Sequence, residues 1–217
     1  MKYIILDFGK VIAGPTTGDW FITPAFIEKV DMSLIDKDAF HEAIKNNSEL
    51  KDGIIKTLEE EYDAFYELYK LALKDIGYKD YEVSKEIAYN FVYENDKYKF
   101  YKNVAKQIRK LKENYKIILL TDNWPCILRI LKEKRMIKLF DDIYVSSMYG
   151  YQKKDGILFD RVIIDYDIQP DEALFIDDNE DLLNIAFAKG LDVRLMDRNN
   201  EIMGSKYKIV HDLDNVI

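Results

Sequence analysis

Short apolar runs alternate with stretches of helical periodicity along much of the 217-residue chain. Runs typical of buried strands occupy residues 3–6, 117–120, 143–145, 173–176 and 193–195, with a weaker one at 208–210. Between them, apolar residues recur every three to four positions, as on one face of an amphipathic helix; residues 101–115 are one example. Strands that alternate with helices predict an α/β fold with a Rossmann-like parallel sheet and right-handed crossovers.

The segment from about Thr16 to Glu94 breaks this alternation, because it contains helical patterns but no strand pattern. Residues 58–72 carry one apolar stripe and residues 83–91 carry another. We therefore expect a helical cap at residues 15–94, inserted after the first strand. The predicted catalytic core is residues 1–14 and 95–217, and the connections are Gly14–Pro15 and Asn95–Asp96.

The composition and charge disfavour several classes of function. A net charge of −8 disfavours non-specific nucleic-acid binding, although a small anionic substrate can still enter a locally positive pocket. The single Cys126 excludes an internal disulfide and a cysteine-based zinc site. We find neither a signal-peptide pattern nor an apolar run of membrane-spanning length. We therefore expect a cytoplasmic protein without nucleic-acid or membrane partners.

Acidic residues follow two of the predicted strands. Asp7 ends the first apolar run, and Asp177 and Asp178 follow the run at 173–176. Adjacent carboxylates at the edge of an apolar sheet are costly unless a cation or hydrogen bonds offset their charge. Both aspartates could instead cap the helix that begins near Asn179, but one would suffice. We therefore favour a site for a hard cation such as Mg²⁺, built from strands that end at one edge of the sheet.

Two further polar residues, Thr121 and Lys153, also come after predicted strands. Together with the aspartates, they are suited to binding and cleaving a phosphate ester. An ionised Asp7 can attack phosphorus and form an aspartyl phosphate. Mg²⁺ would allow this anion to approach a phosphate dianion. Thr121 can donate a hydrogen bond to a phosphoryl oxygen, and Lys153 can neutralise another. The backbone amides of Phe8 and Gly9 could bind the remaining oxygens.

These residues lie in four segments that together resemble the haloacid dehalogenase superfamily of phosphohydrolases. The segments are residues 4–12, 118–123, 150–153 and 175–181. The resemblance implies a sheet core with a small helical cap, a nucleophile at Asp7, and Mg²⁺ bound by Asp178 and the carbonyl of Gly9. It implies a metal-supporting or lysine-pairing role for Asp177 and a third acid at Asp181.

The second matching segment ends with Thr121, Asp122 and Asn123, and the resemblance places all three at the phosphate. Among members of the superfamily, the first motif is most similar to that of sugar-phosphate phosphatases resembling alpha-glucose-1-phosphate phosphatase.

Gly9 is the main departure from the family pattern. Most phosphatases of this superfamily carry a second aspartate there, which protonates the leaving alcohol. General acid catalysis contributes about 10²–10⁴-fold, so its loss slows such an enzyme without abolishing it. We expect a preference for good leaving groups, as in anomeric sugar phosphates. Lys10 could supply the proton, although we favour a solvent-facing side chain, and Asp122 is a less favoured donor.

The sequence thus favours a Mg²⁺-dependent phosphatase acting on a small phosphorylated metabolite. A weakly active or non-catalytic protein that binds a phosphorylated metabolite is the main alternative. A metal-independent dehalogenase would leave the acid pair unexplained. A signalling receiver domain would place its acid pair at the first strand and has no inserted helical block. The specific substrate and the oligomeric state are left open.

Overall fold

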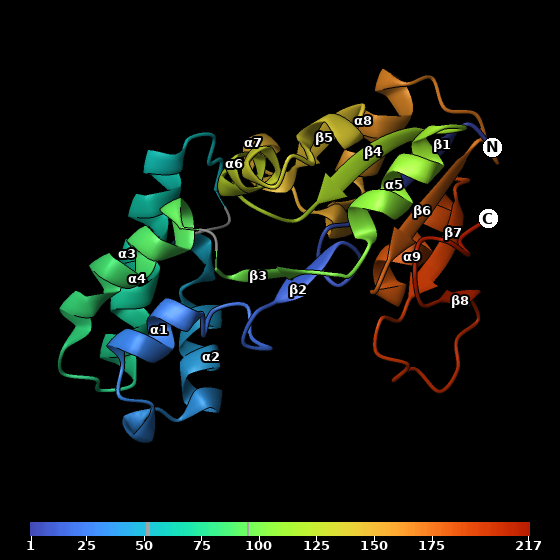
Figure 1. Ribbon diagram of the computed structural model, residues 1–217. Helices are drawn as coiled ribbons and strands as arrows, with labels where there is room; N and C mark the ends of the chain where they lie inside the picture. Colours follow the sequence, from blue (N-terminus) through green and yellow to red (C-terminus); the bar gives the residue numbers. More distant parts are fainter. Residues whose placement is uncertain (51–52, 95) are drawn as a thin grey trace. The chain divides into compact units, whose positions relative to one another are not determined.

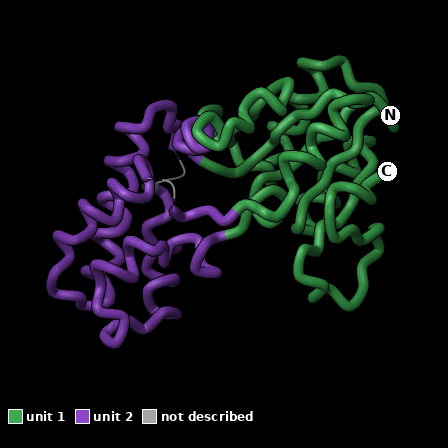
Figure 2. The backbone as a smooth tube through the Cα atoms, viewed as in Figure 1, with its two compact units in different colours: residues 1–14, 100–123, 131–217 green, residues 15–99, 124–130 purple. Residues whose placement is uncertain are grey.

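The computed structural model describes residues 1–50, 53–94 and 96–217 (Figure 1), so the predicted connection at Asn95 lies outside the described residues. The chain divides into two compact units (Figure 2). The core unit comprises residues 1–14, 100–123 and 131–217, and the helical unit comprises residues 15–99 and 124–130. The helical unit therefore includes Trp124–Ile130, a segment that the sequence pattern had placed with the core.

The core unit contains a six-stranded sheet in the order β5-β4-β1-β6-β7-β8, with every adjacent pair parallel. This arrangement confirms the predicted α/β fold. The strands are β1 Tyr3–Leu6, β4 Lys116–Thr121, β5 Asp142–Val145, β6 Ala173–Asp177, β7 Asp192–Met196 and β8 Ile209–Val210. The central strand β1 is flanked by β4 and β6, with Leu6 paired to Leu119 and Ile176. This register brings the chain after Leu6 beside the carboxyl end of β6.

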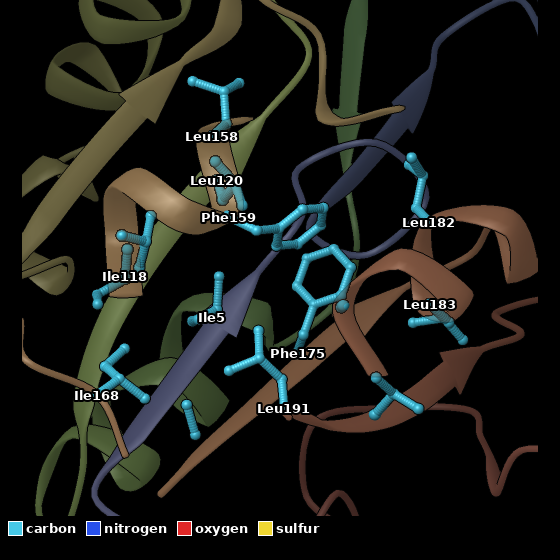
Figure 3. Packing of buried hydrophobic residues seen from close by; sticks show 14 of the residues in the cluster. Ile5, Ile118, Leu120, Leu158, Phe159, Ile168, Phe175, Leu182, Leu183 and Leu191 are labelled. Carbon is cyan, nitrogen blue, oxygen red and sulfur yellow. The ribbon is translucent and has the colours of Figure 1, made fainter. Parts of the chain in front are cut away.

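Apolar side chains from both strands and helices form the interior of the core unit (Figure 3). The helices are α5 Val104–Lys112, α7 Ser146–Tyr149, α8 Ile157–Asp165 and α9 Glu180–Ala188, with short 3₁₀ turns at Ile137–Leu139 and Lys153–Asp155. Phe159 of α8 packs edge-on against Phe175 of β6, with 4.9 Å between the ring centroids. Because β6 is buried over its whole length, Asp177 is held at the end of a rigid, apolar strand.

The helical unit contains α1 Pro24–Lys29, α2 Lys37–Asn46, α3 Leu58–Asp75 and α4 Ser84–Tyr93, with 3₁₀ turns at Met32–Leu34, Ser48–Leu50 and Tyr81–Val83. Helix α3 begins with a capping box, in which Thr57 accepts a hydrogen bond from the Glu60 amide and Glu60 accepts one from the Thr57 amide. Its buried stripe includes Phe65, which stacks on Phe91 of α4 at 4.1 Å. The two helices therefore share one aromatic interior.

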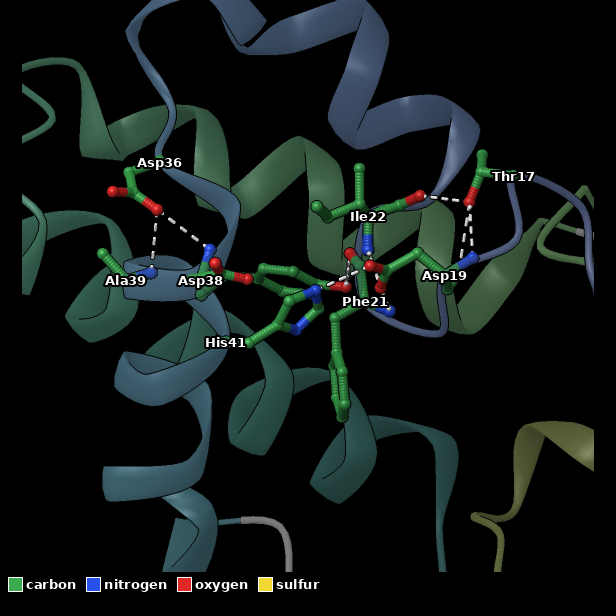
Figure 4. A network of polar contacts seen from close by, with 9 residues as sticks. Thr17, Asp19, Phe21, Ile22, Asp36, Asp38, Ala39 and His41 are labelled. Atoms are coloured by element: carbon green, nitrogen blue, oxygen red, sulfur yellow. Dashed lines mark hydrogen bonds and ion pairs between the residues drawn. The ribbon is translucent and has the colours of Figure 1, made fainter.

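Short polar side chains fix the loops of the helical unit (Figure 4). One oxygen of Asp19 accepts hydrogen bonds from the amides of Phe21 and Ile22, and the other lies 2.7 Å from His41 Nε2. Asp36 caps α2 by accepting from two amides of its first turn. The side-chain contacts to backbone amides join residues two or three positions apart, whereas the contact of Asp19 with His41 spans 22 positions.

Helix α6, Cys126–Glu133, and a two-stranded sheet of β2 Ala13–Pro15 and β3 Tyr98–Phe100 lie where the chain passes between the two units. The hydrophobic pattern did not predict β2 and β3, because each strand has three residues and lacks an apolar run.

Candidate active site

Asp7 lies directly after β1, and its amide donates a hydrogen bond to the carbonyl of Ile176 at 3.0 Å. The following loop turns back on itself, since the amides of Ile12 and Ala13 both donate to the carbonyl of Phe8. Phe8 is completely buried in the core unit, so its ring is part of the interior. Gly9 forms an isolated bridge with Ala13. The turn therefore holds Asp7 and the amides that follow it in a fixed arrangement.

Lys153 joins two of the predicted acids. Its Nζ donates to Asp7 Oδ1 at 2.7 Å and to Asp177 Oδ2 at 2.6 Å. All three side chains are almost completely buried. The other oxygen of Asp177 accepts from the Asn179 amide at 2.9 Å, so both its oxygens are engaged. Of the two roles considered for Asp177, the lysine-pairing one is the contact present here.

Burial governs the charge of this group. Burial raises the pKa of Asp7 to about 7, against the opposing influence of the Lys153 ammonium. Burial alone would lower the pKa of Lys153, but the carboxylates of Asp7, Asp177 and Asp122 outweigh it and raise that pKa. Lys153 is therefore a permanent positive charge beside Asp7.

Asp7, Asp177 and Asp178 each offer an oxygen, and these oxygens lie within 4.8 Å of one another. Asp178 Oδ2 also lies 3.1 Å from Lys10 Nζ. Burial, followed by the charge of Asp177, raises the pKa of Asp178. Three adjoining carboxylates, two of them buried, are the hard oxygen donors that Mg²⁺ requires, so the residues present fit that ion. Asp181 is exposed and does not belong to this cluster.

The remaining predicted residues lie at the end of β4 and directly after it. Thr121 is the last residue of β4, is buried, and pairs with Val145 of β5 in the sheet. Asp122 accepts a hydrogen bond from the Lys153 amide at 2.9 Å, and burial raises its pKa. Asn123 is buried, and its amide donates to Ser146 Oγ at 3.2 Å. The predicted segments thus meet at one edge of the sheet.

Two residues of this region were not assigned to it from the sequence. Ser146 contacts both Asp122 and Asn123 and supports that segment. The only sequence signal for Ser146 is its position directly after the strand ending at Val145. The side chain of Lys10 is exposed, as expected, but its ammonium also contacts Asp178, a pairing that the sequence did not indicate. None of the helices in the described part of the chain combines the length and the apolar character that a membrane-spanning helix needs.

Solved structures similar to this chain share its fold at low sequence identity. One is the HAD-hydrolase YfnB from Bacillus subtilis bound to magnesium, with a TM-score of 0.68, 18% identity, and coverage of 98% of this chain and 95% of that one. Another is a HAD family enzyme from Bacteroides thetaiotaomicron in complex with magnesium and inorganic phosphate, with a TM-score of 0.60, 17% identity, and coverage of 94% and 98%. The third is a 2-haloacid dehalogenase from Pseudomonas syringae, with a TM-score of 0.66, 14% identity, and coverage of 99% and 95%.

No curated protein matches the chain. A family model described as haloacid dehalogenase-like hydrolase matches residues 15–192, which is well over half of the sequence. The matched range begins after Asp7, so the evidence for Asp7 is its position and contacts. Together with the confirmed fold, the family match shows that this chain belongs to the haloacid dehalogenase-like hydrolases.

Proposed function

We propose that this protein is a Mg²⁺-dependent phosphatase that hydrolyses a small phosphorylated metabolite through an aspartyl phosphate on Asp7. The supporting observation is the buried group in which Lys153 contacts Asp7 and Asp177 while Asp178 completes a cluster of three carboxylates. A carboxylate nucleophile with an adjoining fixed ammonium and a cation site is suited to a dianionic ester, whose charge would otherwise repel it.

Each residue of the site has a separate role in the proposed reaction. Asp7 attacks phosphorus, and the ammonium of Lys153 keeps Asp7 oriented and neutralises negative charge on the phosphoryl group. Thr121 and the backbone amides after Asp7 donate hydrogen bonds to the phosphoryl oxygens. When bound by Asp7, Asp178 and the Gly9 carbonyl, with Asp177 in support, Mg²⁺ supplies charge neutralisation between nucleophile and phosphate. Burial of Asp7 and Lys153 strengthens these interactions because little water screens them.

Gly9 leaves no carboxylate to protonate the leaving group. We therefore propose substrates whose leaving group departs as a stable anion, with anomeric sugar phosphates as the leading class. Gly9→Asp should accelerate hydrolysis of alkyl phosphates by up to about 10²-fold and change aryl phosphate hydrolysis much less. An equal effect on both would remove the leaving-group argument.

Two alternatives remain distinct from this proposal. Some solved structures with this fold are dehalogenases, and in such a reaction Asp7 would attack carbon without a metal. The carboxylate cluster favours the phosphatase, because metal-independent attack on carbon uses Asp7 but does not explain why Asp178 adjoins it. A protein that binds a phosphorylated metabolite and turns it over slowly is the second alternative, favoured by the missing acid at Gly9.

The test is a panel of phosphorylated metabolites and 2-haloacids, assayed for phosphate and halide release with Mg²⁺ or with a chelator. We expect phosphate release that requires Mg²⁺ and falls at least about 10²-fold in Asp178→Asn. Asp181→Asn is the matched control, since Asp181 is exposed and lies outside the cluster. Halide release that persists in chelator would refute the phosphatase. A single burst of phosphate followed by slow turnover would support the binding protein.

A further inference from the structure

Lys10 supplies a second ammonium to the carboxylate cluster, and it differs from Lys153 in one important respect. Lys153 is almost completely buried and contacts two carboxylates, so it cannot leave without exposing both. Among the residues that the structure describes, the one ion pair of Lys10 is with Asp178, and 55% of its side chain is exposed to solvent. Lys10 can therefore move into water at little cost, because a single ion pair with a half-exposed lysine contributes little to stability.

The backbone holds Lys10 in the position from which it reaches Asp178. Lys10 has a φ of 50°, in the left-handed region that residues other than glycine rarely adopt. Its amide donates to the carbonyl of Ala13 at 2.8 Å, inside the same turn that follows Asp7. The placement of Lys10 is thus fixed by the nucleophile loop, and only the side chain is free to leave.

The charges of the group show why an exchange would be favourable. When Asp7, Asp177 and Asp178 are ionised, the ammonium groups of Lys10 and Lys153 leave one negative charge uncompensated. If a divalent cation replaces Lys10, the three carboxylates, the Lys153 ammonium and the cation together carry no net charge. Neutrality matters here because two of the three carboxylates are buried, where an uncompensated charge is costly.

We propose that Lys10 is a resident cation that competes with the divalent metal for Asp178 and thereby sets the metal affinity of the site. This inference rests on the proposed Mg²⁺ site. Metal binding must displace the Lys10 ammonium from Asp178, so Lys10 weakens the affinity of the cluster for Mg²⁺. In the protein with Mg²⁺ bound, the Lys10 side chain is therefore no longer in contact with Asp178.

The experiment is calorimetric titration of Mg²⁺ into the chelator-treated 217-residue protein, which needs no substrate. Lys10→Met should bind Mg²⁺ about three- to tenfold more tightly than the unaltered protein. Lys112→Met is the matched control, because Lys112 pairs with Asp141 at 3.0 Å. Asp141 also accepts from the Ile117 amide, near the start of β4 and so at the opposite edge of the sheet. This control removes the same charge without touching the cluster.

The same Lys10→Met substitution, made in the Asp178→Asn variant, tests whether the effect depends on the contact between Lys10 and Asp178. In Asp178→Asn the ammonium has lost its partner, so adding Lys10→Met should change the Mg²⁺ affinity less than it does in the unaltered protein. Equal Mg²⁺ affinity in Lys10→Met and Lys112→Met would overturn the inference, while measurable binding in both would leave the metal site intact. If neither Lys10→Met nor the unaltered protein binds Mg²⁺, both the inference and the Mg²⁺ dependence of the proposed function fail.

Discussion

Substituting Asp7 with asparagine should separate the stability of the fold from its activity. Asparagine keeps nearly the shape of the aspartate and resembles its protonated form, but it carries no charge. Asp7 is 6% exposed, and burial is the main reason that its pKa is raised. The native charge at this position therefore opposes folding, although the proposed chemistry requires it.

The size of the effect follows from the pKa. It rises from an ordinary value of 3.8 to about 7 in the folded protein. Between these values the folded state binds more protons than the unfolded state, so the free energy of unfolding decreases as the pH rises. The stabilisation is complete below about pH 4 and is lost by about pH 8, and it amounts to roughly 4 kcal/mol. Asp7→Asn lacks this dependence, so it should be the more stable protein at high pH.

The measurement is urea unfolding in the presence of a chelator, from about pH 4 to pH 8. Far-ultraviolet circular dichroism is the appropriate signal. The chain's two tryptophans, Trp20 and Trp124, both belong to the helical unit and do not report on the core unit. Activity toward p-nitrophenyl phosphate with Mg²⁺ is measured in parallel, and we expect it to be lost in Asp7→Asn.

Two results would refute this reasoning. If the free energies of unfolding of Asp7→Asn and the unaltered protein change in parallel with pH, Asp7 is not the group whose burial is costly. If Asp7→Asn hydrolyses p-nitrophenyl phosphate as fast as the unaltered protein does, Asp7 is not the nucleophile.

The remaining predictions concern buried residues of the core unit and of the helical unit. Lys153→Met leaves two buried carboxylates without their ammonium and should reduce the free energy of unfolding by about 3–5 kcal/mol at pH 8, whereas the exposed Lys154→Met should change it by less than about 0.5 kcal/mol. Equal effects of the two substitutions would show that the ion pairs of Lys153 do not stabilise the fold. Phe65→Ala should cost about 3–5 kcal/mol in the helical unit. Because Phe65 packs edge-on against Trp124 at 4.8 Å, tryptophan fluorescence should detect this loss, and an unchanged urea midpoint would contradict it.

Much of the fold was predictable because its signals are local. The central strands β1, β4 and β6 coincide with short apolar runs, since a strand buried on both faces must be apolar along its length. Once the sheet is known to be parallel, the residues after its strands must share one edge, which brings Asp7 near Asp177 without any structural information. The strands β2 and β3 were not predicted, because three residues are too few to show a pattern of apolar and polar positions.

The sequence by itself determined the α/β class, the helical insertion and the edge of the sheet at which the acids gather. Only the tertiary structure decided which charges meet there. The contact of Lys153 with Asp7 joins residues 146 positions apart, and Lys10, whose side chain is exposed as expected, also forms an ion pair with Asp178. Such pairings depend on the register of neighbouring strands and the path of the connecting loops. A side-chain ion pair requires agreement to within an ångström, which no local pattern of apolar and polar residues specifies.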